Sequence, residues 1–210
     1  LHLVDLGGGA LTPLTHLPHV VSHATRDTPD LLARVVGAVE RTIEERERLR
    51  VEGAVPGPGA PPRPEVFVIV DGWGVLRAEH DDLERRLVHL AARALGAGVH
   101  LVLTAVRWSE MRPALLDVVG SRIELRLGDP HESVVERRAA DSVPAELPGR
   151  GIVAGVNGSG PSATRIAQPR LFADPTLSQS PVELTCRTIS EHWTRPRPAR
   201  LRELPELVLV

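Results

Sequence analysis

The chain has 210 residues, 42% of them hydrophobic and 25% charged, with a formal net charge of −2. This length and composition are those of one globular domain, and the near-neutral charge excludes a basic field for nucleic acid or an anionic membrane. The single cysteine, Cys186, excludes an internal disulfide framework, and no apolar run reaches the ~18 residues of a membrane span.

The first half of the chain alternates short apolar runs with amphipathic segments. Leu1 to Leu6 predicts a buried strand that ends in a run of three glycines. Thr28-Pro29-Asp30 predicts a helix start with Thr28 as the capping residue, and apolar residues at helical spacing continue to about Arg50. A Pro- and Gly-rich segment at 53–64 then predicts a flexible insertion.

The middle of the chain repeats this alternation. Val66 to Val70 is apolar throughout, as expected of a central parallel strand, and a second amphipathic helix is predicted from Leu83 to Leu95. His100 to Thr104 predicts the next buried strand, and Ser109 is placed to cap a short helix. This alternation predicts an α/β fold with a mainly parallel sheet and crossover helices.

The second half carries weaker patterns. Arg122 to Leu127 alternates with period two and predicts a strand with one exposed face. A loop-rich region is expected from about Asp129 to Ser180. Val182, Cys186, Ile189 and Trp193 predict the buried face of a last helix, and a Pro- and Arg-rich tail is expected over 194–210.

Asp71 is the sharpest candidate for chemistry, because an apolar strand followed by Asp is the pattern that holds Mg²⁺ in P-loop ATPases. Hydrolysing ATPases usually carry a second acid at the next position, where this chain has Gly72. The other interpretation of Asp71 is a buried strand whose first turn residue is Asp. Thr104 ends the neighbouring predicted strand, where it could sense a phosphate or simply cap a turn. Arg122 could reach the phosphate of a neighbouring subunit or simply border a sheet.

A phosphate-binding loop is hard to find in the chain. Gly155 to Ser162 fits the P-loop pattern except at Pro161, which stands where the lysine should be, so we interpret this string as a polar loop. All 25 basic residues are arginines, so no residue of the chain can serve as the P-loop lysine.

Several segments in order resemble the FtsK/SpoIIIE-like ATPase modules of EccC-type motors in type VII (ESX) secretion. The set covers nearly the whole chain and comprises Leu3–Gly9, Leu17–Val20, Val66–Gly74, His100–Trp108, Arg112–Leu115, Ser121–Pro130, Pro148–Gly151, Ile166–Arg170 and Trp193 with the tail after it. The resemblance implies a P-loop NTPase-like (RecA/FtsK-type) fold, and we expect one incomplete module at 1–193 whose N-terminal P-loop strand is missing.

The resemblance further implies ATP and Mg²⁺ as possible cofactors. Asp71, Thr104 and Arg122 are the residues expected to bind them, with Asp71 as the metal ligand. It implies contacts with neighbouring ATPase modules, oligomerisation of the motor, and secreted WXG100-like helical proteins that carry a C-terminal signal. It places the module on the cytoplasmic side of the membrane, in a membrane-anchored actinobacterial protein, with no nucleic acid expected.

Four functions remain open at this stage. The first is a degenerate module that recognises substrates or regulates the motor, and the missing acid and lysine favour it. The second is the downstream part of an active ATP-hydrolysing module. The third is a DNA translocase of the same superfamily, and the near-neutral charge argues against it. The fourth is an unrelated α/β domain, and the ordered set of motifs argues against it.

Overall fold

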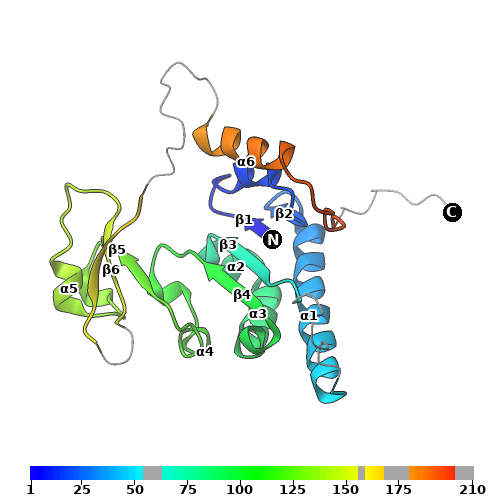
Figure 1. Cartoon of the computed structure of the whole chain (residues 1–210). Helices are drawn as coiled ribbons and strands as arrows, with labels where there is room; N and C mark the ends of the chain where they lie inside the picture. Colours follow the sequence, from blue (N-terminus) through cyan, green and yellow to red (C-terminus); the bar gives the residue numbers. More distant parts are fainter. Residues whose placement is uncertain (54–62, 156–158, 168–179, 202–210) are drawn as a thin grey trace. The chain divides into compact units, whose positions relative to one another are not determined.

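The computed structural model describes all residues except 54–62, 156–158, 168–179 and 202–210 (Figure 1). The chain divides into two compact units, one formed by residues 1–104 and 171–210 and the other by residues 105–170. No helix of the described part is long and apolar enough to cross a membrane. The predicted insertion at 53–64 falls almost wholly outside the described residues.

The first unit is built on a four-stranded sheet in which every strand is parallel to its neighbours. The strands are β1 (His2–Asp5), β2 (Ser22–Thr25), β3 (Val66–Asp71) and β4 (Val99–Leu103), in the order β2-β1-β3-β4. The three apolar strands predicted from the sequence are confirmed, as is the parallel sheet. Strand β2 was not predicted, because its sequence, Ser-His-Ala-Thr, lacks an apolar run.

Helices α1 (Pro29–Val51), α2 (Trp73–Glu79) and α3 (Asp81–Ala94) follow the strands, and η2 (Leu95–Ala97) leads into β4. The predicted apolar stripe of α1 is buried: Leu31, Leu32, Val35, Val36, Val39 and Ile43. Helix α1 packs against α3, and Arg86 and Arg93 of α3 pair with Glu40 and Glu47 of α1. Helix α2 was not predicted. Thr28 occupies the N-cap position of α1 as predicted, but its side chain makes no capping hydrogen bond, because the hydroxyl oxygen accepts the amide of Thr25 instead (2.8 Å).

Helix α6 (Pro181–Glu191) packs against the short helix η1 (Thr12–His16). His16 lies 3.4 Å from Glu183 of α6. The prediction for the buried face of α6 was only partly right: Cys186 is buried, but Ile189 is exposed and Trp193 lies beyond the end of the helix. In the tail, the amide of Leu201 donates to the carbonyl of Val21 (2.8 Å).

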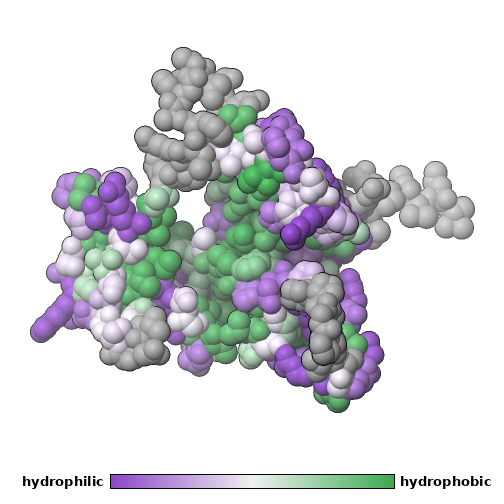
Figure 2. Space-filling view, in the orientation of Figure 1, coloured by the Kyte–Doolittle hydropathy of each residue, from purple (hydrophilic) through white to green (hydrophobic). Residues whose placement is uncertain are grey.

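One half of the parallel sheet keeps apolar side chains at the surface. Phe67 of β3 and Val102 of β4 remain 37% and 46% exposed, and Figure 2 shows hydrophobic residues at the surface over these two strands. Strand β4 is the last strand of this sheet in the described part of the chain.

The second unit contains η3 (Trp108–Glu110), α4 (Pro113–Leu116), η4 (Pro130–Glu132) and α5 (Arg137–Asp141), with an antiparallel sheet of β5 (Ile123–Leu125), β6 (Arg150–Val153) and β7 (Ser162–Arg165). Ala140, Val143 and Ile152 form a small core. The loop-rich region expected after Asp129 therefore contains two strands and a helix, which are too short to show a periodic pattern. Ser109 does not cap α4, which begins after Arg112.

Candidate functional site

The carboxyl ends of β3 and β4 bring together two of the three residues predicted for the site. The Thr104 hydroxyl donates to Oδ1 of Asp71 (2.6 Å) and accepts a hydrogen bond from the amide of Gly72 (3.0 Å). Ligands of open parallel sheets bind at this edge. The parallel register between β3 and β4 places Asp71 and Thr104 at corresponding strand ends, and so the two side chains meet.

The second carboxylate oxygen of Asp71 lies against Gly7 at the end of β1. A Cβ atom on Gly7 would stand 2.1 Å from Oδ2 of Asp71, so only glycine fits there without moving the carboxylate. The Leu6 amide also donates to the backbone carbonyl of Asp71 (2.9 Å). A glycine turn after β1 was predicted from the sequence. The contact of Gly7 with Asp71 was not, because it joins residues more than sixty positions apart.

Asp5 occupies the corresponding position on β1, directly beside Asp71 in the sheet register. Its side chain is almost fully buried, and its two oxygens accept the amides of Gly9 and Leu11 (2.9 Å each). His23 of β2 approaches the same carboxylate at 3.5 Å. The loop after β1 is therefore closed onto Asp5, and Gly9 adopts the positive φ of 90° that this turn requires.

Gly72 stands where a catalytic ATPase would have its second acid. Its φ of 89° is left-handed, and a Cβ atom would come within 3.0 Å of the Gly7 amide nitrogen and 3.1 Å of the Leu6 carbonyl carbon. The next residue, Trp73, is completely buried, and its amide donates to the carbonyl of Thr104 (2.8 Å). The turn is thus fixed on both sides in a conformation that favours glycine.

The residues at this edge fit a magnesium ion only as partners of a nucleotide. Asp71 supplies one carboxylate oxygen without a described hydrogen-bond partner, and no group of three or more His, Cys, Asp or Glu side chains in the described ranges could hold a metal ion. Magnesium commonly takes one or two carboxylates and completes its coordination with water and substrate phosphates. A single carboxylate beside a threonine hydroxyl matches that pattern.

Arg122 lies in the second unit. Its guanidinium donates to the carbonyl of Leu116, and its Nε is buried without a partner among the described residues. The P-loop-like string at 155–162 crosses residues outside the described ranges, but its last residue, Ser162, begins strand β7. A P-loop opens a helix, so the interpretation as a polar loop is the one that fits.

The sequence matches the model of the FtsK/SpoIIIE family over residues 1–158. It is 38% identical to the ESX secretion system protein EccC of Thermomonospora curvata over an alignment 231 residues long. This alignment covers 99% of this chain and 16% of that protein. It is 41% identical to the ESX-4 secretion system protein EccC4 of Mycobacterium tuberculosis over 166 residues, which cover 72% of this chain and 13% of the relative. The chain thus spans about a sixth of the length of these relatives.

The structure is also similar to a solved one. Thermomonospora curvata EccC (ATPases 2 and 3) in complex with a signal sequence peptide superposes with a TM-score of 0.75 at 37% identity, over 97% of this chain and 38% of that one. The likeness confirms the predicted P-loop NTPase-like architecture, here with the antiparallel β5-β6-β7 sheet in addition. The chain belongs to the FtsK/SpoIIIE family, with the EccC ATPase domains of type VII secretion systems as its relatives.

Proposed function

We propose that this chain is an ATPase-family module of a type VII secretion motor that does not hydrolyse ATP itself and acts in substrate recognition or regulation. The turn at Gly72 carries this proposal. An acid that activates the attacking water would have to stand at this position, beside the metal-binding Asp71. The left-handed backbone and the adjacent Gly7 amide leave no room for such a side chain.

Nucleotide binding is a separate part of the proposal. Asp71 is the proposed ligand of a weakly bound Mg²⁺-nucleotide, and Thr104 the residue that orients it. Arg122 is proposed to act toward a nucleotide only across a subunit boundary, as an arginine in an oligomeric motor can. The lack of any lysine in the chain supports weak binding, because a phosphate-binding loop within these residues would lack its cation.

The partners are proposed from the relatives. The solved structure of Thermomonospora curvata EccC comprises ATPases 2 and 3 in complex with a signal sequence peptide. We propose accordingly that this module contacts neighbouring ATPase modules in an oligomeric motor on the cytoplasmic side of the membrane. Its substrates would be small helical, WXG100-like proteins with a C-terminal signal.

The alternative is the downstream part of an active module whose phosphate-binding loop comes from residues outside this chain. The exposed apolar side chains on β3 and β4 favour it, because all-parallel sheets normally have both faces covered. One further strand and helix packed at β4 would cover them. Gly72 argues against hydrolysis in this case too.

Isothermal titration with Mg·ATP up to about 1 mM, the range of weak sites, separates the two proposals. The chain and a longer version that carries preceding residues of the same protein are titrated side by side, followed by phosphate-release assays. Binding without hydrolysis in either version supports the degenerate module. Hydrolysis by the longer version would support the alternative and overturn our main proposal. A parallel titration with a C-terminal peptide of a WXG100-like protein tests substrate recognition. If neither version binds the peptide, the proposal of substrate recognition is wrong.

A further inference from the structure

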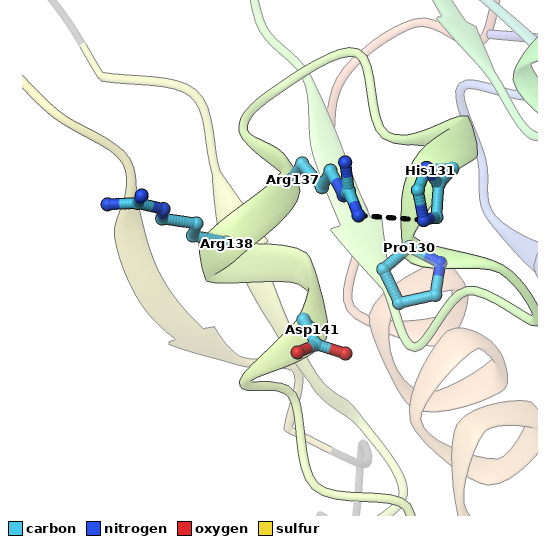
Figure 3. A pocket seen from close by; sticks show the side chains of 5 residues that line it. All are labelled: Pro130, His131, Arg137, Arg138 and Asp141. Atoms are coloured by element: carbon cyan, nitrogen blue, oxygen red, sulfur yellow. Dashed lines mark hydrogen bonds between the residues drawn. The ribbon is translucent and has the colours of Figure 1, made fainter.

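A pocket of about 490 Å³ lies in the second unit, between η4 and α5. Five residues line it: Pro130, His131, Arg137, Arg138 and Asp141 (Figure 3). Its volume is within the usual range for ligand sites in proteins. Nothing in the proposed nucleotide function uses these residues.

The two lining segments are held in place by carboxylates that bind backbone amides. Glu124 of β5 is only 2% exposed, and its carboxylate accepts the amides of Val134 and Val135 (2.8 and 3.0 Å) and the hydroxyl of Ser133 (2.7 Å). This single buried side chain ties the connection between η4 and α5 to the antiparallel sheet.

Each lining helix also has a carboxylate cap. Asp129 accepts the amide of His131 (2.8 Å), and Glu136 accepts the amides of Arg138 and Ala139 (2.9 and 2.8 Å). The backbone positions of the lining residues are therefore fixed before any ligand arrives. A rigid frame of this kind lowers the entropy cost of binding.

The charges in the pocket are not compensated within the described part of the chain. Arg137 lies in hydrogen-bond contact with Nε2 of His131 (2.8 Å). Asp141 lies one helical turn after Arg137. Figure 3 marks a hydrogen bond from Arg137 to His131 and none to Asp141. Figure 3 shows the guanidinium of Arg137 turned toward His131, while Arg138 points away from both. Arg137 thus keeps its positive charge and most of its N–H donors for another acceptor.

We propose that this pocket binds a carboxylate group, with Arg137 as its main contact and His131 as the residue that orients the guanidinium. A planar guanidinium matches a carboxylate through two parallel hydrogen bonds. Asp141 in the lining offsets part of the positive charge of Arg137, and this suits a singly charged carboxylate better than a doubly charged phosphate. The carboxylate comes either from a small free acid or from an acidic residue of a peptide.

Titrations followed by ¹H–¹⁵N NMR of the full chain test this proposal. The probes are sodium acetate, the blocked tripeptide Ac-Ala-Glu-Ala-NH₂ and inorganic phosphate, all at constant ionic strength set with sodium chloride. We expect saturable shifts of the Arg137 Nε–H and of amides in 130–141 with acetate or the tripeptide. Stronger shifts with the tripeptide would assign the peptide source, and equal shifts the free acid.

Three variants make the test specific. Arg137→Gln should weaken carboxylate binding about tenfold or more, because it removes a charged donor. Arg150→Gln removes an exposed arginine outside the pocket and should leave binding unchanged. Asp141→Asn should tighten binding by about two- to threefold, because it removes a nearby like charge. The spectrum of each variant also reports whether the fold is intact.

Shifts that do not saturate, or that are equal in the Arg137→Gln and Arg150→Gln variants, would show general screening and overturn the proposal. Phosphate that binds more tightly than either carboxylate probe would also overturn it. An unchanged affinity in Asp141→Asn would contradict the charge argument by which the carboxylate was chosen over phosphate.

Discussion

The hydroxyl of Thr104 donates a 2.6 Å hydrogen bond to the carboxylate of Asp71 and thereby joins the ends of β3 and β4. The same oxygen accepts the amide of Gly72, so one exposed side chain holds both the candidate metal ligand and the turn after it. Thr104→Val keeps the shape and removes both bonds. We expect it to lower the free energy of unfolding by about 1 kcal/mol, because two partners lose their contact at an exposed site.

Urea unfolding measures this effect, and Thr104→Ser is the matched control because it retains the hydroxyl. Serine should recover most of the lost stability. Equal losses in both variants would show that the methyl group, and not the hydrogen bonds, is what matters at this position.

Gly7→Ala tests the contact between β1 and Asp71. The added Cβ would lie 2.1 Å from Oδ2 of Asp71, so the carboxylate must move and the sheet edge must adjust. Strained insertions of this kind cost about 1–3 kcal/mol. Gly120→Ala is the control, because no atom lies within 4 Å of its Cβ position. Thermal unfolding that is the same for both variants would contradict the close approach described above.

Gly72→Glu places the acid of a hydrolysing ATPase after Asp71. We expect no ATP hydrolysis and a melting temperature lower by about 4–8 °C, since a left-handed non-glycine residue costs ~1–2 kcal/mol and the Gly7 backbone adds a contact. Gly128→Glu adds the same charge in open space and should leave the melting temperature nearly unchanged. Phosphate release by Gly72→Glu with Mg·ATP would refute the argument that the turn at Gly72 has no room for a catalytic acid.

His2 predicts a pH dependence of stability. Burial, the larger cause, and the nearby chain-terminal ammonium lower its pKa to about 4 from an ordinary 6.5, and its Nδ1 lies 2.8 Å from the Ser22 hydroxyl. The unfolded chain therefore binds a proton below about pH 6.5, whereas the folded chain does so only near pH 4. Stability from this group is full above pH 6.5 and is lost as the pH falls toward 4, by at most about 3 kcal/mol.

The measurement is urea unfolding of the chain and of His2→Gln at pH 7.5 and pH 4.5. The loss of stability on acidification should be smaller in the variant by roughly 2 kcal/mol, because its side chain does not titrate. The carboxylates titrate in both proteins, so their contribution cancels in the comparison. An equal loss in both would exclude His2 as the cause.

Glu124→Ala tests the buried carboxylate of the second unit. It leaves the amides of Val134 and Val135 and the hydroxyl of Ser133 without their acceptor, at a cost of about 3 kcal/mol or more. We expect faster proteolysis within 129–141, measured by mass spectrometry of the fragments. Glu132→Ala removes an exposed acid from the same segment and should leave the cleavage rate unchanged. Equal rates would show that Glu124 does not hold this segment.

The sequence predicted the parts of the fold in which local pattern and tertiary packing agree. Strands β1, β3 and β4 are apolar and bury part (β1 nearly all) of their side chains in the core, and α1 carries a full apolar stripe. Strand β2 could not be predicted, because its sequence lacks an apolar run and its place in the sheet is set by pairing with β1. Strands β6 and β7 were missed because they are too short to show a periodic pattern.

The candidate site shows the same division. Asp71 and Thr104 were identified because each follows an apolar strand, which is a local feature. Their hydrogen bond, and the contact of Asp71 with Gly7, depend on the register between distant strands and leave no trace in local spacing. Arg122 belongs to the second compact unit, and this division of the chain also leaves no trace in local spacing.

The carboxylate of Asp5 occupies backbone N–H donors of the glycine-rich loop after β1. Backbone amides in such turns are donors that commonly attract phosphates. Here two of them, from Gly9 and Leu11, already bind an oxygen of the protein itself. The loop thus carries an internal substitute for an anionic ligand. A phosphate that reaches this edge must displace the Asp5 carboxylate from these two amides or find other donors.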